Sequence, residues 1–178
     1  MKILQRLLFW VLAALILSSC GTSYQENRQR RAAEKAAERA AIIQAIEDCN
    51  FILEVTQIIP QRFPSRHSQG EYQLRLEGDV VTTRLPFIGV SYEPTYGGTD
   101  EISIVFEKEK VQLIKNFSNV PTKGEYIFQF AGGKGKTPWM VTLSVFESGS
   151  ASIYCAASGG RNMSYFANLV IPKKDENP

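Results

Sequence analysis

The spacing of the hydrophobic residues changes near residue 50, which predicts a helix followed by a β domain. Residues 25–49, "QENRQRRAAEKAAERAAIIQAIEDC", contain no Gly or Pro and are rich in Ala, Glu, Arg and Lys, all strong helix formers. Large apolar side chains gather only near the end of this segment, at Ile42, Ile43 and Ile46. The pattern therefore predicts a helical stalk whose last turns dock on the domain that follows.

From Phe51 onward, apolar and polar residues alternate as they do in half-buried strands. The segment "EYQLRLEGDVVTTRL" predicts a hairpin that turns at Gly78-Asp79, and "WMVTLSVFESGSASIYC" predicts another that turns at Ser148-Gly149. Turn signals separate about nine such strands, and no second helical period appears among them. We therefore expect a mainly β fold, an antiparallel barrel-like or two-sheet body preceded by one N-terminal helix.

The N-terminus has the pattern of an export signal. Lys2 and Arg6 flank the start of an apolar run at residues 7–17, which is too short to span a bilayer. The segment "LSSCG" that follows resembles a bacterial lipobox, in which small residues precede a lipidated cysteine. The resemblance implies that Cys20 carries the lipid and anchors the protein in a membrane without a transmembrane helix. The alternative is an ordinary secretory signal followed by an unmodified cysteine.

These features predict four segments along the chain. They are a lipoprotein signal peptide at 1–19, a lipidated tether and helical stalk at 20–48, an all-β domain at 49–172 and a disordered tail at 173–178. Surface-exported lipoproteins of Bacteroidota, as a class, often carry acidic residues directly after the cysteine. Here the first acid is Glu26, so we expect an outer-membrane lipoprotein of the cell envelope that faces the periplasm.

The charge of the processed chain argues against a nucleic-acid partner. The full chain has 20 Lys and Arg against 18 Asp and Glu, and removal of residues 1–19 takes away Lys2 and Arg6, which leaves 18 of each sign. A chain with no basic excess lacks the electrostatic signature of a nucleic-acid-binding protein.

Cys49 and Cys155 also remain after processing. In an oxidising envelope they could form a disulfide, and two buried free thiols are the alternative.

The segment "FAGGKGKTPW" ends in Gly-Lys-Thr at 135–137, like a phosphate-binding loop, but the rest of that motif is missing. Phe130 occupies the position of its first glycine, and a strand rather than a helix is expected to follow. We therefore expect a glycine-rich, positively charged loop and no bound nucleotide.

The single histidine, His67, has no neighbours at metal-ligand spacing, and no nucleophile elbow accompanies it. Neither a metal, a cofactor nor a catalytic triad is predicted.

Glycoside hydrolysis needs only two carboxylates, so counting residues does not remove that alternative. The acids in and beside the predicted strands are Glu71, Glu77, Asp79, Glu93, Asp100 and Glu101, and no pair of them stands out. Enzymatic activity is accordingly the least favoured class of function.

Four aromatic residues lie in or beside loops and are the candidate ligand-binding residues. Phe87, Tyr92 and Tyr96 belong to "RLPFIGVSYEPTYGGTD", and Trp139 follows the glycine-rich loop. The prolines and glycines of the first stretch are explained by an irregular backbone crossing, but its aromatic residues are not. Exposed aromatic rings can stack on glycans or small apolar ligands, whereas packing over the loops is the alternative. We expect a concavity lined by these four side chains.

Several of these segments together resemble a known family. They are "YQLRLEGDVVTTRLP", "LPFIGVSYEPTYGG", "ISIVF" and "FESGSASIYCAASGGRNMSYFANL". The resemblance runs from about Phe51 to Pro172 and is to an uncharacterised Bacteroidota family of small, exported, often lipid-anchored β proteins, a domain of unknown function. It implies an envelope location and supplies no substrate, cofactor or catalytic residue.

The sequence therefore predicts a lipid-anchored cell-envelope binding or structural module without evident catalysis. Its partners would be the membrane, through the lipid on Cys20, and a small apolar ligand, a glycan or an envelope protein. The alternatives are a periplasmic docking protein that uses an open strand edge or its glycine-rich loops, and a carboxylate-dependent envelope hydrolase.

Overall fold

The computed structural model describes residues 22–68, 70–88, 103–134 and 138–172. The chain divides into two compact units, residues 1–40 and 41–178, and helix α2, Thr22–Glu47, begins in the first and ends in the second. Cys20, Tyr92, Tyr96 and the predicted tail lie outside the described residues. In the ranges that are described, no helix is long and apolar enough to cross a membrane.

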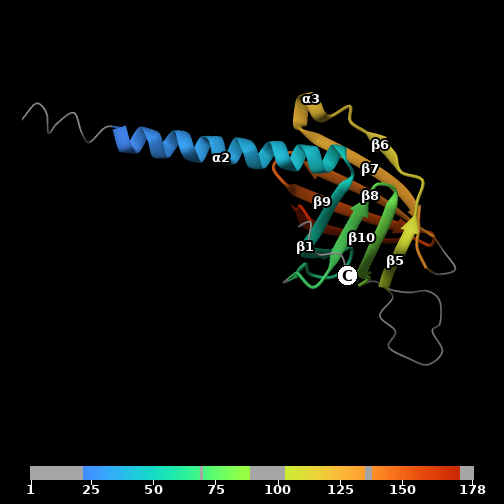
Figure 1. The fold of residues 1–178 in the computed structure, drawn as a ribbon. Coiled ribbons are helices and arrows are strands. Elements are labelled where there is room, and N and C mark those ends of the chain that lie inside the picture. Colours follow the sequence, from blue (N-terminus) through green and yellow to red (C-terminus); the bar gives the residue numbers. More distant parts are fainter. Residues whose placement is uncertain (1–21, 69, 89–102, 135–137, 173–178) are drawn as a thin grey trace, which may run out of the picture. The chain divides into compact units, whose positions relative to one another are not determined.

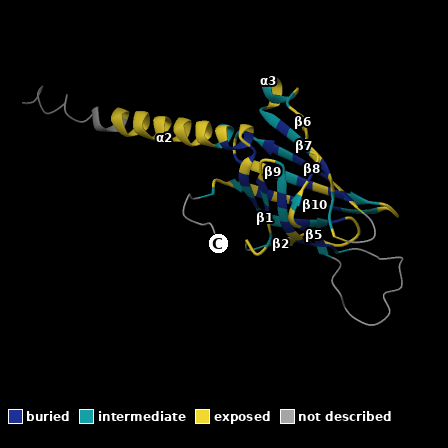
Figure 2. Cartoon of the chain, turned by 45° about the vertical axis from the view of Figure 1, so that its right-hand side comes forward, coloured by how far each residue is buried: buried dark blue, intermediate teal, exposed yellow. Residues whose placement is uncertain are grey.

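The last turns of α2 belong to the core of the second unit. Residues 25–41 are exposed, whereas Ala45 and Ile46 are buried among the side chains of the β body (Figure 2). Ile42 lies against the turn that contains Gly149, where an added Cβ would be 3.2 Å from the Ile42 Cδ1 atom. The docking predicted from the cluster of isoleucines is confirmed. Cys49 then takes a left-handed conformation, with φ of 53°, and turns the chain into the first strand.

The β body is one antiparallel sheet of ten strands, in the order β5-β4-β3-β1-β10-β9-β8-β7-β6 with β2 beside β1 (Figure 1). The mainly β prediction is confirmed, and a single curled sheet replaces the two-sheet alternative. The strands are β1 (Asn50–Pro60), β2 (Arg66–His67), β3 (Gln73–Glu77), β4 (Val80–Pro86), β5 (Ser103–Lys110), β6 (Ile114–Asn116), β7 (Glu125–Gly132), β8 (Trp139–Phe146), β9 (Ser150–Ala157) and β10 (Arg161–Val170).

Both predicted hairpins are present. Gly78 and Gly149 have φ of 64° and 83°, which an L side chain rarely adopts, and they turn β3 into β4 and β8 into β9. Strand β2 and the helix α3, Val120–Lys123, were not predicted, because two and four residues are too few to give a periodic signal.

The inward side chains of the curled sheet form one continuous core. The buried residues of β8, β9 and β10 fall at every second position, and Leu143, Ile153 and Tyr165 have no exposed surface. The rings of Phe51 and Phe128 are 5.8 Å apart across this core. Fully burying one such side chain contributes about 1.5–3 kcal/mol. The core therefore explains the alternation seen in the sequence.

The glycine-rich segment after β7 joins the end of the sheet to β5. The Lys134 backbone N–H donates to the carbonyl oxygen of Val105 at 2.8 Å, and the Gly133 N–H donates to the Glu109 carboxylate at 3.0 Å. The Lys134 ammonium also pairs with Glu107. In the order of the sheet, β5 is at one end and β7 is next to the other end. The contacts between them therefore help the sheet to curl.

A side chain at Gly132 would displace its neighbours at this junction. A Cβ there would be 2.5 Å from Glu109 Oε1 and 3.1 Å from the Phe106 ring, which itself packs edge-on against Phe130 at 5.6 Å between centroids. The loop expected from the sequence thus has a structural purpose, because its glycines let two segments of backbone approach closely.

Candidate functional site

Two of the four candidate aromatic residues lie in contact. Phe87 follows the end of β4 and Trp139 begins β8, and their ring centroids are 5.4 Å apart at a tilt of 53°. The Arg161 guanidinium carbon lies 5.6 Å from the centroid of the Trp139 ring. Arg161 is one of the odd-numbered residues of β10, which point toward the core. Phe87 and Trp139 are only 8% and 3% exposed. As described, they form a packed corner of the core rather than an open aromatic surface.

Tyr92 and Tyr96 lie outside the described residues, so their place in a ligand site remains a prediction. The corner that precedes them is held by Tyr165, whose hydroxyl donates to the backbone carbonyl of Pro86 at 2.7 Å. Burial raises the pKa of this phenol, and the nearby Cys155 raises it further. Tyr165 is therefore a neutral hydrogen-bond donor that fixes the end of β4 beneath Phe87.

Cys49 and Cys155 are both free and buried. Both side chains are thus buried thiols, the alternative to the disulfide that an oxidising envelope would allow. Burial raises the pKa of Cys155 to about 12. The reactive form of cysteine is the thiolate, so this side chain behaves as a small apolar core residue.

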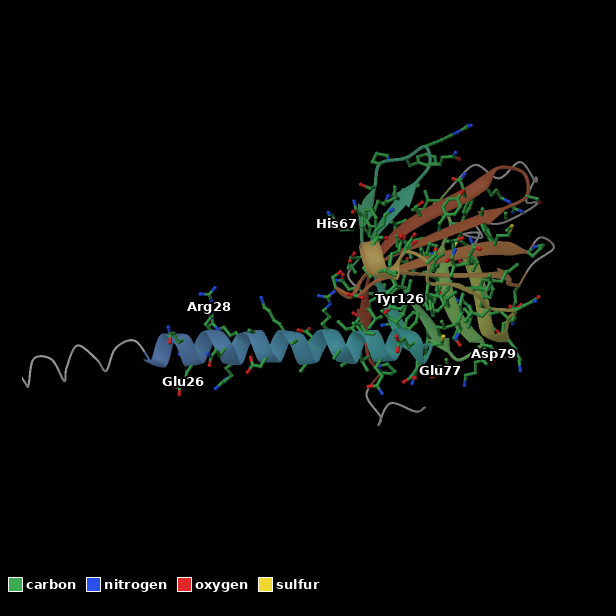
Figure 3. All side chains as sticks on the ribbon, turned by 90° about the horizontal axis from the view of Figure 1, so that it is seen from above. Glu26, Arg28, His67, Glu77, Asp79 and Tyr126 are labelled. Atoms are coloured by element: carbon green, nitrogen blue, oxygen red, sulfur yellow. The ribbon has the colours of Figure 1, made fainter. Side chains whose placement is uncertain are left out.

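The remaining candidates for catalysis and metal binding are dispersed over the surface. His67 lies in β2 and is well separated from Glu77 and Asp79 (Figure 3). Glu77 pairs with Arg75 at 2.9 Å and Asp79 pairs with Lys110 at 3.1 Å. Over the described ranges, no group of three or more His, Cys, Asp or Glu side chains could hold a metal ion. Glu93, Asp100 and Glu101 lie outside those ranges.

A feature that the sequence analysis missed is the composition of the outward side of β8, β9 and β10, which we call the uncharged face. All of its side chains are neutral. They are Met140, Thr142, Ser144 and Phe146 of β8, Ser150, Ser152, Tyr154 and Ala156 of β9, and Asn162, Ser164, Phe166, Asn168 and Val170 of β10. The outward positions of an antiparallel sheet that faces solvent are commonly polar, and here three neighbouring strands expose polar and apolar side chains but no charge.

Three large apolar side chains cross the uncharged face on a diagonal. Strand register places Met140 opposite Ala156, two residues from Tyr154, and places Tyr154 opposite Ser164, two residues from Phe166. Side chains in such diagonal positions have Cα atoms about 7–8 Å apart. Met140, Tyr154 and Phe166 are 68%, 45% and 50% exposed, so the row is open to solvent.

Hydroxyl groups surround this row. Tyr154 lies between Thr142 and Ser164, and Ser152 lies beside Phe166. A hydroxyl both donates and accepts hydrogen bonds, so the surroundings of the rings are polar without being charged.

Acidic residues mark both sides of the uncharged face. Glu54 of β1 lies opposite Asn168, and Glu125 of β7 lies opposite Phe146. Beyond β1 the outward residues of β3 and β4 include charges such as Arg75, Glu77 and Arg84. On this side of the sheet β1 and β7 carry one charged residue each, and charges become frequent only at β3 and β4. The sequence already contains this pattern of neutral residues. Apart from the turn between β8 and β9, the outward positions in residues 140–157 and 162–170 carry no Lys, Arg, Asp or Glu.

The sequence pattern of a family described as "Domain of unknown function (DUF4251)" matches residues 33–169. The chain belongs to this family. Comparison with curated proteins gave no match. The chain is similar to the crystal structure of a DUF4251 family protein from Bacteroides eggerthii DSM 20697, with a TM-score of 0.55 and 14% identity over 78% of this chain and 91% of that chain. The similarity confirms the resemblance read from the sequence and establishes the DUF4251 fold.

Proposed function

We propose that this protein is a lipid-anchored binding module of the cell envelope and that it recognises its partner through the uncharged face. The anchor is the lipid on Cys20, as the lipobox pattern "LSSCG" implies, and the residues that follow form a tether and helix. On this proposal the protein is held at the outer membrane and faces the periplasm.

The observation that carries the binding proposal is the exposed diagonal of Met140, Tyr154 and Phe166 on a face without charge. Charged side chains are depleted and aromatic residues and Met are enriched at the centres of recognition surfaces. Tyr and Phe also present a large contact area while few rotatable bonds are immobilised on binding. A face kept free of charge costs little to desolvate, which favours recognition over mere solubility.

One lysine placed in the uncharged face tests the binding proposal. The mature chain, residues 20–178 with Cys20→Ala to remove the lipid, is sedimented with isolated cell envelopes. Ser152→Lys puts a charge between Tyr154 and Phe166 and should release the protein into the supernatant. Thr82→Lys is the matched control, because Thr82 is also a half-buried, outward-facing hydroxyl residue but lies in β4. Equal sedimentation of the two variants would refute the binding face.

The anchor has a separate test. Labelling of the full chain in cells with a palmitate analogue should occur in the wild type and be absent from Cys20→Ala. Persistent labelling of the variant would show that the lipid is elsewhere and would remove the anchor from the proposal without affecting the binding face.

A further inference from the structure

The chemistry of the uncharged face narrows the class of partner that it fits. Nucleic acids and acidic polysaccharides bind chiefly through Lys and Arg, and no outward position of β8, β9 or β10 carries either residue. An extended peptide gains its main-chain hydrogen bonds at a strand edge, and these three strands are all paired on both sides within the sheet. The face instead offers side-chain hydroxyls, amides and aromatic rings.

The shape of the face also matters. The core lies on the inner side of the curled sheet, so β8, β9 and β10 present their convex side to solvent. Two copies of such a convex surface would contact each other over a small area only. Stable protein interfaces bury about 1,200–2,000 Å² in total. A flexible chain that drapes over the convex face can contact the whole diagonal from Met140 to Phe166.

We propose that the ligand of the uncharged face is a neutral glycan chain laid along the diagonal. This inference rests on the proposed function and specifies its ligand. The faces of Tyr154 and Phe166 contact the C–H surfaces of successive sugar rings, and Met140 extends the apolar track. Thr142, Ser152 and Ser164 exchange hydrogen bonds with sugar hydroxyls, because both partners donate and accept.

The absence of charge then has a purpose. A carboxylate or ammonium group on this face would lose water when a neutral chain covered it and would gain no opposite charge in return. Asn162 and Asn168 supply amide donors and acceptors without adding charge.

Affinity electrophoresis tests the glycan directly. The mature chain with Cys20→Ala is run in native gels that contain hydroxyethyl cellulose, laminarin, yeast mannan or dextran, and in a gel that contains the anionic polygalacturonate. At least one neutral polysaccharide should retard the protein. Tyr154→Ala and Phe166→Ala should each weaken that retardation by about three- to tenfold, and the double variant should abolish it.

Phe63→Ala is the matched control, because Phe63 is an aromatic residue of similar exposure, 46%, that lies outside the uncharged face. It should migrate like the wild type in every gel. Circular dichroism of all variants separates loss of binding from loss of folding, and the exposed rings of Tyr154 and Phe166 contribute little to the core.

Three results would overturn the glycan. They are unretarded migration in all four neutral gels, stronger retardation in polygalacturonate than in any neutral gel, and retardation that the Tyr154 and Phe166 variants leave unchanged. If envelope sedimentation still depends on Ser152 in that case, the binding face stands and its ligand is not a neutral glycan. If sedimentation is also insensitive to Ser152→Lys, the proposed function fails as well.

Discussion

The hydroxyl of Tyr165 on β10 donates a hydrogen bond to the backbone carbonyl of Pro86 at the end of β4, 2.7 Å away within the core. The two residues are 79 positions apart in the sequence. β10 lies three places from β4 in the order of the sheet, so this bond bridges the inside of the curl. It fixes the point at which the chain leaves β4 for Phe87.

Tyr165→Phe should lower the free energy of unfolding by about 1–3 kcal/mol, because it leaves the buried Pro86 carbonyl without its donor. Tyr154→Phe is the matched control, since its hydroxyl is on the exposed face, and it should leave stability unchanged. Urea denaturation of the two variants measures the difference. Equal stabilities would show that the Tyr165 hydroxyl contributes nothing to the fold.

The junction between the segment after β7 and β5 predicts a large effect of one methyl group. Gly132→Ala forces the Glu109 carboxylate away from the Gly133 N–H and crowds the Phe106 ring, so it should destabilise the protein by about 1–3 kcal/mol beyond any backbone strain. Gly160→Ala is the control for an added methyl group at a positive φ without crowding, because Gly160 has φ of 74° and no atom lies within 4 Å of a Cβ added there. Thermal unfolding that ranks Gly160→Ala as the more damaging change would contradict this account of the junction.

The two core thiols make a prediction about redox state. In the Cys20→Ala variant, a thiol reagent should find two reactive cysteines after unfolding without reductant, and prior reduction should not raise that number, because Cys49 and Cys155 are free. The folded protein should react slowly, since both side chains are buried. No thiol before reduction and two after it would establish a disulfide instead.

Cys155 also predicts a loss of stability in alkali. Its pKa is about 12 in the folded protein and near 9.0 when exposed, so between these values the unfolded chain releases a proton that the folded chain retains. This contribution is intact below pH 9.0 and falls by about 1.4 kcal/mol per pH unit above it. The free energy of unfolding of Cys155→Ala should decline less steeply over this range. Parallel declines in the two proteins would show that Cys155 is not shielded as described.

The sequence was sufficient for the elements that local patterns determine. The turns at Gly78 and Gly149 follow from residues beside them in the chain, and the docked end of α2 follows from Ile42 and Ile46. The junction of Gly133 with Glu109 was not predictable, because 24 residues separate the partners and the pattern of either segment says nothing about the other.

The candidate site shows the same division. Phe87 and Trp139 lie beside loops in the sequence, and only the structure shows that their rings are in contact within the core. The uncharged face has a different physical reason. Its neutral positions are visible in the sequence, but the diagonal of Met140, Tyr154 and Phe166 depends on strand register, which the local pattern does not determine.

Hydroxyl-radical footprinting tests the central claim, that the uncharged face is the binding surface, without any substitution in that face. The mature chain with Cys20→Ala is oxidised alone and when bound to isolated envelopes, and modification of each side chain is read by mass spectrometry. Met140, Tyr154 and Phe166 are exposed and should be protected on binding, whereas Phe63, at 46% exposure, should be oxidised equally in both states. Protection of Phe63 with continued oxidation of Tyr154 and Phe166 would place the binding surface elsewhere and contradict the account.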